Sequence, residues 1–167
     1  MTDTSVVRIN IAICSCQRPK LLAKALASIA AMASPEGTEV IVSVIDNDPQ
    51  QSAKTVCRDW QTKLGVALHY EHEPQRGIPL ARNRAIDVAH QLGAHYLVFI
   101  DDDEWVESDW LCELYRYALS LGGKAVVHGA VVPELPQGAP QYMGEIFFDK
   151  GRPTGTALGS CATNNVL

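Results

Sequence analysis

This sequence of 167 residues lacks any apolar run that approaches the roughly 20 residues that a membrane-spanning helix needs. Met1 to Arg8 also lack the charged and apolar regions of a secretory signal. Positive charge is not in excess, because 14 Lys and Arg residues stand against 19 Asp and Glu residues and the formal net charge is −5. These absences argue against nucleic acid as a partner, and they favour a cytoplasmic protein of one domain.

The cysteines are odd in number and irregularly spaced. The five cysteines are Cys14, Cys16, Cys57, Cys112 and Cys161. Their odd number, together with the apolar segments around three of them, favours reduced core residues over a disulfide framework. Cys14 and Cys16 could form half of a zinc site, but no second Cys or His pair follows at a suitable spacing. His69 and His72 are the only near-cluster of histidines, and scattered histidines of this kind are more often surface residues than ligands.

Apolar periodicity predicts strands that alternate with helices along the chain. We expect strands over residues 7–14, 39–45, 66–71, 95–100 and 124–132. We expect helices over residues 19–32, 53–64, 80–92 and 109–121, several of them bounded by proline or glycine. This order is typical of right-handed βαβ units around a mostly parallel sheet, and so of the α/β class.

The sequence changes character from Pro133 onward. Proline and glycine punctuate this region, and residues 146–148 form its one short apolar run. We therefore expect residues 1–132 to form the α/β domain and residues 133–167 to be an irregular segment of the same domain. A further strand begins near Ala162, and we expect the chain to stop inside it, truncated at its C-terminal end.

Three adjacent aspartates follow the apolar stretch 96–100 directly. Asp101, Asp102 and Asp103 would repel one another at the end of a buried strand unless a cation or hydrogen-bond donors compensate their charge. A divalent cation such as Mg²⁺ or Mn²⁺ is the simplest compensation, because it takes oxygen ligands and shares them with substrate phosphates. The alternative is a solvated acidic loop that only caps a helix starting near Ser108.

Other polar clusters follow other predicted strands. Residues 14–18 come after the first strand, residues 46–48 after the second, and Arg76 and Arg82 border the start of the third helix. Ligands of open α/β sheets bind outside the carboxyl ends of the strands, and arginines at a helix start can hold an anion. Carboxylates and arginines on one edge suit a metal-bound nucleoside diphosphate, whereas the alternative is that both arginines pair with surface carboxylates.

These clusters resemble those of the family 2 glycosyltransferases in order and approximate spacing. The matching pieces are the strand that ends in Cys14-Ser-Cys-Gln-Arg18, the turn Asp46-Asn-Asp48, the element Arg76-Gly-x-x-x-Ala-Arg82-Asn83, and the aspartates 101–103. The resemblance implies the A-type glycosyltransferase fold, a Rossmann-like three-layer α/β/α domain with a mostly parallel mixed sheet. Residues 14–17 depart from the usual family pattern, in which a proline-threonine-aromatic run precedes an asparagine.

The resemblance also implies roles for individual residues. The backbone of residues 14–16 and the side chain of Asp46 would contact the nucleobase and ribose, and Arg76 and Arg82 would lie near the base or the diphosphate. The full set of nucleotide-binding residues is Cys14, Ser15, Cys16, Arg18, Asp46, Arg76, Arg82, Asp101 and Asp102. Asp103, joined by Asp101, would bind Mn²⁺ or Mg²⁺, and Asn164 and Trp105 would lie near the donor sugar.

The implied reaction transfers a sugar from a nucleotide-diphosphate sugar, with a UDP-sugar favoured, to a hydroxyl of a sugar, a lipid-linked sugar or another acceptor. We expect this transfer to be inverting and to belong to polysaccharide or glycan biosynthesis. We expect the catalytic base beyond Leu167, because the downstream carboxylates are only Glu134, Glu145 and Asp149. Residues 133–167 would then face the acceptor. Peripheral membrane association and a homo-oligomer both remain open.

Two other functions remain as alternatives. The chain could be a catalytically incomplete nucleotide-sugar-binding or regulatory module of the same fold. It could also be a metal-dependent phosphatase or nucleotidyltransferase, since these enzymes use clustered aspartates too. The Thr/Ser and Lys pattern that aspartyl-nucleophile phosphatases carry after their aspartates is absent after Asp103, which argues against the last alternative.

Overall fold

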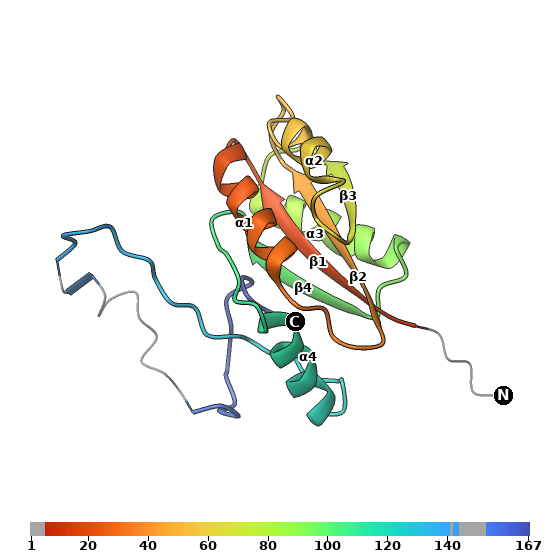
Figure 1. The fold of residues 1–167 in the computed structure, drawn as a ribbon, viewed down its shortest axis with the longest axis vertical. Helices are drawn as coiled ribbons and strands as arrows, with labels where there is room; N and C mark the ends of the chain where they lie inside the picture. Colours follow the sequence, from red (N-terminus) through yellow and green to blue (C-terminus); the bar gives the residue numbers. More distant parts are fainter. Residues whose placement is uncertain (1–5, 141, 144–152) are drawn as a thin grey trace.

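The computed structural model describes residues 6–140, 142–143 and 153–167, and its centre is a parallel sheet (Figure 1). Its four strands are β1 (Val7–Ser15), β2 (Thr38–Asp46), β3 (Ala67–His72) and β4 (Tyr96–Asp101). They lie in the order β3-β2-β1-β4, and every neighbouring pair is parallel. The register pairs Ser15 with Asp46 and Cys14 with Asp101, so the polar residues that follow the three strands share one edge.

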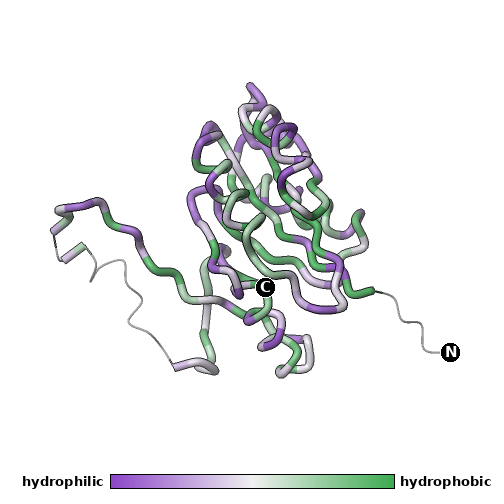
Figure 2. The backbone as a smooth tube through the Cα atoms, viewed as in Figure 1, coloured by the Kyte–Doolittle hydropathy of each residue, from purple (hydrophilic) through white to green (hydrophobic). Residues whose placement is uncertain are grey.

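Four helices cover the two faces of this sheet. They are α1 (Pro19–Ala31), α2 (Lys54–Trp60), α3 (Ile78–Gln91) and α4 (Trp110–Ser120). Apolar residues of α1, α2 and α4 pack in one core cluster against β1, β2 and β4. A second, smaller cluster joins α3 to Ala12 and Ile45 on the other face. The predicted three-layer α/β/α architecture is therefore confirmed. Figure 2 shows hydrophobic residues along the central strands, whereas the surrounding segments mix hydrophobic and hydrophilic residues.

Local sequence explains where these elements begin. Pro19 occupies the first turn of α1, where its missing N–H removes no helical hydrogen bond. Leu22 and Leu26 follow at helical spacing and are fully buried, which contributes roughly 1.5–3 kcal/mol each to the hydrophobic stabilisation. The second helix ends at Trp60, four residues before its predicted end, and Leu64 then donates its N–H to the Trp60 carbonyl at 3.0 Å before Gly65 turns the chain with φ +78°. None of the helices in the described residues is long and apolar enough to cross a bilayer.

The strand predicted over residues 124–132 is wrong. Val166 occupies the position beside β4 instead, in antiparallel bridges to Phe99 on one side and to His128 on the other. Residues 127 and 167 exchange two backbone hydrogen bonds of 2.8 and 2.9 Å, so each segment reaches the sheet for only a few residues. These bridges are the antiparallel part of the predicted mixed sheet. They hold the residues that precede Leu167 beside the turn formed by Asp101, Asp102 and Asp103 after β4, which we call the aspartate turn (Figure 1).

Asn165 fixes this C-terminal segment in place. Its side-chain oxygen accepts a hydrogen bond from Trp110 Nε1 at 2.6 Å, and its Nδ2 donates to the Ala130 carbonyl at 2.8 Å. The division of the chain at residue 132 stays a prediction, but the contacts at Asn165 show that residues on both sides of it pack together.

Gly129→Ala should loosen this contact. A Cβ at position 129 would lie 2.6 Å from Nδ2 and 2.7 Å from Oδ1 of Asn165, and that amide is already held by two hydrogen bonds. We expect the free energy of unfolding to fall by about 1–3 kcal/mol, measured by urea denaturation. Gly159→Ala is the matched control, since a Cβ there meets nothing within 4 Å. Equal stability of the two variants would contradict this account of residue 129.

Candidate functional site

The carboxyl ends of β1 and β4 meet at Asp102. The Ser15 hydroxyl at the end of β1 donates a hydrogen bond to Asp102 Oδ2 at 2.8 Å, and Asp102 is only 4% exposed. Burial raises the pKa of Asp102, while the Ser15 hydrogen bond and the Arg18 charge act in the opposite direction. The aspartate turn is therefore anchored to β1, and it is not the solvated acidic loop that the alternative hypothesis proposed.

Arg18 joins two of the three aspartates. Its Nη1 lies 3.2 Å from Asp102 Oδ1 and 2.7 Å from Asp103 Oδ2. The charges of Asp102 and then of Asp103 raise the pKa of Arg18. Asp103 and Arg18 both keep about half of their side-chain surface exposed, 47% and 51%. Asp103 therefore presents an accessible carboxylate beside an accessible guanidinium, and an arriving ligand can reach both.

Arg82 makes the corresponding contact to Asp101 from the first turns of α3. Its Nη2 lies 2.9 Å from Asp101 Oδ1, its guanidinium lies 5.3 Å from the centroid of the Phe99 ring, and its Nη1 donates to the Thr163 carbonyl. Cys14 lies in the same environment: burial raises the pKa of its thiol to about 12, against the opposing effect of Arg82. Arg82 thus connects the aspartate turn, α3 and the C-terminal segment.

The three aspartates have different surroundings, although they are consecutive. Within the described ranges, no three His, Cys, Asp or Glu side chains are grouped so that they could hold a metal ion. Asp101 and Asp103 are accessible and paired with different arginines, whereas Asp102 is buried. Any cation at this edge would need most of its ligands from substrate oxygens and water.

Asp46, predicted to contact the nucleoside, is fully buried in this structure. Its carboxylate accepts hydrogen bonds from the backbone N–H groups of Ala53 at 2.9 Å and Asp48 at 3.1 Å, and from the Tyr70 hydroxyl at 3.1 Å. Burial, together with the Asp46 charge, raises the pKa of Tyr70 well above its usual range. These contacts show that Asp46 organises the loop after β2, and its contact with a nucleoside stays a prediction.

Asn47 has a role that the sequence analysis missed. Its Nδ2 donates to the carbonyls of Glu73 at 2.9 Å and Gln75 at 2.8 Å, and its Oδ1 accepts the N–H of Gly77 at 2.8 Å. Asn47 therefore fixes the loop that carries the exposed Arg76 to the start of α3. An asparagine in a turn at a sheet edge was the available signal, because its amide can both donate and accept.

Glu104 is a second residue that the sequence analysis missed. One carboxylate oxygen accepts the N–H of Asp101 at 3.0 Å, and the other accepts Asn164 Nδ2 at 2.6 Å. Asn164, predicted to lie near the donor sugar, is thereby held beside the aspartate turn. Glu104 was visible in sequence only as a fourth acid after the three aspartates, which gave no indication of its bond to a residue 60 positions away.

Other predicted residues have simpler outcomes. Cys16 donates its thiol to the Asn47 carbonyl at 3.4 Å, so residues 14–16 line the same edge as the turn after β2. His72 lies 3.2 Å from the Asp48 carbonyl and His69 lies 3.5 Å from Glu71, so the two histidines have separate partners. Among the downstream carboxylates, Glu134 pairs with Lys24, while Glu145 and Asp149 lie outside the described residues.

The sequence matches the model of the family described as glycosyl transferase family 2 over residues 10–155. The chain belongs to this family. It is 36% identical over 137 residues to the succinoglycan biosynthesis protein ExoM of Rhizobium meliloti (strain 1021), covering 82% of this chain and 43% of ExoM. The chain thus spans less than half the length of this relative.

Solved structures of two other proteins share the fold. The structure of S. aureus TarS residues 1–349 superposes with a TM-score of 0.60 at 18% identity, over 77% of this chain and 39% of that one. Mannosyltransferase PcManGT from Pyrobaculum calidifontis, in complex with GDP-Man and Mn²⁺, gives a TM-score of 0.54 at 22% identity, over 70% of this chain and 34% of that one. At these identities the likeness establishes the nucleotide-sugar transferase fold that the resemblance implied.

Asn47→Ala should destabilise the loop before α3. The variant loses three hydrogen bonds and leaves backbone groups of Glu73, Gln75 and Gly77 without this partner, so we expect the free energy of unfolding to fall by about 2–3 kcal/mol in urea denaturation. Asn83→Ala, at an exposed position of α3, is the control and should be neutral or slightly stabilising. A loss for Asn47→Ala no larger than that of the control would contradict the role given to Asn47.

The buried Asp102 should make stability depend on pH. A carboxyl whose pKa is raised in the folded chain stabilises it fully below the unfolded pKa, and this contribution is lost as the pH rises through the folded pKa. Relative to the unchanged chain, Asp102→Asn should therefore gain stability as the pH rises above about 4, the usual pKa of an unfolded aspartate. Urea denaturation at a series of increasing pH values, in buffer with EDTA, measures the difference, with Asp109→Asn as the control. Parallel pH profiles for Asp102→Asn and the unchanged chain would be inconsistent with a raised pKa.

Proposed function

We propose that this chain binds a nucleoside-diphosphate sugar at the shared carboxyl edge of β1 and β4, and that it forms the donor-binding part of an inverting glycosyltransferase of polysaccharide or glycan biosynthesis. The observation that carries the proposal is the alternation of charge at this edge. Arg18 holds Asp102 and Asp103, and Arg82 holds Asp101. This arrangement places the accessible guanidinium of Arg18 beside the accessible carboxylate of Asp103, and the largely buried guanidinium of Arg82 beside the partly exposed Asp101, so that cations and carboxylates lie side by side, as a metal-bound diphosphate requires.

A diphosphate could exchange partners with these groups. Arginine forms charge-assisted hydrogen bonds to phosphate with the same geometry that it uses for carboxylate. When Arg18 or Arg82 turns to a phosphate oxygen, Asp103 or Asp101 is released, and a released carboxylate is a ligand for a cation. A structure of TarS in complex with UDP-GlcNAc, TM-score 0.56 at 18% identity, supports a nucleotide sugar as donor, and we favour a UDP-sugar.

The residues at the edge fit Mn²⁺ or Mg²⁺. Asp101 and Asp103 offer oxygen donors that solvent can reach, and these are the ligands that hard divalent cations prefer. Asp103 would hold the metal, with Asp101 as a second ligand. When bound, the metal supplies positive charge against the charge that develops on the departing nucleoside diphosphate. The Mn²⁺ in the PcManGT complex supports this choice.

We give the other residues the roles that the family resemblance implies. The backbone of residues 14–16 would contact the nucleobase and ribose, and Asp46 would support that contact from its buried position by organising the loop after β2. Arg76 would lie near the nucleoside, and Asp102 would orient the ribose or sugar through its fixed position beside Ser15. Asn164, held by Glu104, would contact the donor sugar. The acceptor would be a hydroxyl of a sugar or lipid-linked sugar. A cytoplasmic location, membrane association and oligomeric state remain predictions.

Asp103→Asn should remove the metal dependence of nucleotide binding. Calorimetric titration of UDP into the unchanged chain should show binding that Mn²⁺ strengthens by about tenfold or more, because Asp103 would hold the cation and the cation would supply positive charge to the phosphates. Asp103→Asn should bind UDP equally with and without Mn²⁺. Asp109→Asn, an exposed aspartate just before α4, is the control and should keep the full effect.

Each negative result would contradict a different part of the proposed function. If Asp103→Asn kept the Mn²⁺ effect, the metal would be held elsewhere and the assignment of Asp103 would be wrong. If neither UDP nor GDP bound with Mn²⁺ present, the donor site itself would be wrong. Donor binding without sugar transfer to any acceptor would favour the binding module over the enzyme, and hydrolysis of p-nitrophenyl phosphate would favour a phosphatase.

A further inference from the structure

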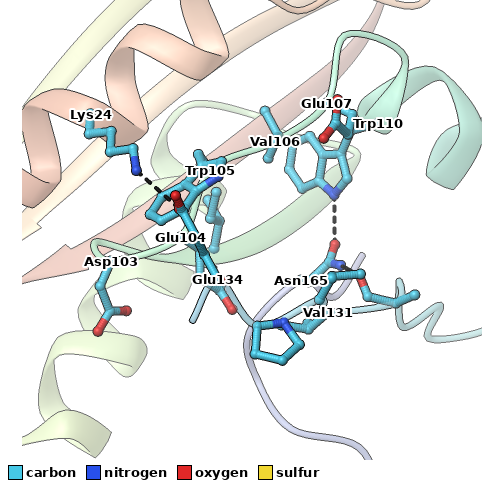
Figure 3. A pocket seen from close by; sticks show the side chains of 14 residues that line it. Lys24, Asp103, Glu104, Trp105, Val106, Glu107, Trp110, Val131, Glu134 and Asn165 are labelled. Atoms are coloured by element: carbon cyan, nitrogen blue, oxygen red, sulfur yellow. Dashed lines mark hydrogen bonds and ion pairs between the residues drawn. The ribbon is translucent and has the colours of Figure 1, made fainter. Parts of the chain in front are cut away.

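A cavity of about 820 Å³ adjoins the aspartate turn on the α1 side of the sheet (Figure 3). Its wall includes Asp103, Trp105 and Trp110 from the residues that follow β4, Lys24 from α1, and residues 130–134. The volume lies within the roughly 300–1,000 Å³ of small-molecule sites. Because Asp103 belongs both to this wall and to the proposed metal site, a molecule in the cavity would lie next to the donor.

The two indoles of the cavity differ in what they can offer a ligand. Trp110 donates its Nε1–H to Asn165 at 2.6 Å and is part-buried, so it is a fixed part of the wall. Trp105 is 40% exposed, and its ring face carries the ammonium of Lys24 at 3.2 Å from the centroid. An electron-rich ring face that attracts an ammonium also attracts the polarised C–H groups of a sugar ring. Trp105 is therefore the one of these two rings that can stack on a ligand.

The charges of the wall select against anionic ligands. Four carboxylates line the cavity, from Asp103, Glu104, Glu107 and Glu134, against the single ammonium of Lys24. Glu134 already pairs with that ammonium at 3.3 Å. Asp103 pairs with Arg18 at 2.7 Å, whereas Glu104 and Glu107 have no ion-pair partner among the described residues. An anion would therefore meet net negative charge at these two carboxylates, whereas the hydroxyls of a neutral sugar can donate hydrogen bonds to carboxylate oxygens.

We propose that this cavity is the acceptor subsite and that it binds a neutral saccharide, with Trp105 as the stacking surface and with Lys24 as the side chain that the saccharide displaces from the ring. This inference rests on the proposed function, because only a transferase has an acceptor substrate. It goes beyond that function by assigning the acceptor a place, a charge and a ring to stack on. Trp105, which the resemblance placed near the donor sugar, is thereby assigned to the other substrate.

The test measures saccharide binding and nucleotide binding on the same samples. Saturation-transfer NMR with cellobiose, lactose, maltose and gentiobiose should detect binding of at least one neutral disaccharide to the unchanged chain, and digalacturonate should show none. For the disaccharide that binds, Trp105→Ala should weaken binding by about tenfold or more, while UDP binding with Mn²⁺ stays as in the unchanged chain. Trp60→Phe, on α2 and away from the cavity, is the control and should bind the disaccharide normally.

Two further variants guard against a folding defect. Trp105→Phe keeps a ring face and should retain most of the binding, and its thermal unfolding should match that of Trp105→Ala. Lys24→Ala removes the ammonium that competes for the ring, so it should bind the disaccharide about two- to fivefold more tightly. A large loss of binding in Lys24→Ala would overturn the displacement of Lys24.

The acceptor proposal and the donor proposal fail in different ways. If UDP binds but none of the four disaccharides does, or if disaccharide binding survives Trp105→Ala, or if digalacturonate binds as well as they do, the acceptor subsite is wrong and the donor site stands. If a disaccharide binds through Trp105 but UDP does not bind, the cavity is a saccharide site and the proposed transferase function fails.

Discussion

The contact between Ser15 and Asp102 is the constraint on which the arrangement of the sheet edge depends. It joins the last residue of β1 to the turn after β4 across two adjacent parallel strands, and it places a carboxylate where water reaches little of it. Because the middle aspartate points inward, its two neighbours point to either side and meet different arginines. One buried hydrogen bond thus converts a run of like charges into an ordered alternation of carboxylates and guanidinium groups.

The same reasoning explains what could be predicted from the sequence and what could not. Strands, helices and layers follow from local periodicity and from proline and glycine at element ends, so the elements between Val7 and Trp110 were predicted to within one or two residues at their ends, apart from the end of α2, which lies four residues before its prediction. The strand over residues 124–132 could not be judged locally, because Val166 competes for the same edge of β4 and the outcome depends on a contact between distant segments. Which segment pairs with an edge strand depends on tertiary contacts, and strand propensity alone does not determine it.

The candidate site shows a similar division. Arginines and aspartates were recognised from residue type and from their places after strands, and the structure brings Arg18 and Arg82 to the aspartate turn. Asn47 and Glu104 were missed, since each acts on backbone or side-chain groups of a segment 26 to 60 positions away. Asp46 was assigned to a ligand, yet its oxygens receive three hydrogen bonds within the protein. Residue type identifies a charged group at an edge, but only packing decides whether that group remains available.

The different exposure of the three aspartates also explains how the carboxyl edge of the sheet could serve the two proposed substrates. Asp103 is the one aspartate that both pairs with Arg18 on the proposed donor side and belongs to the wall of the cavity that Trp105 also lines. A group transfer needs its two reactants within a few ångströms of each other, so the residue between their sites has to be accessible from both. Asp102 is buried and Asp101 is held by Arg82 and by the backbone bond to Glu104, which leaves neither on the cavity wall. The inward turn of Asp102 therefore does more than balance charge, because it leaves Asp103 accessible at the boundary between the proposed donor and acceptor sites.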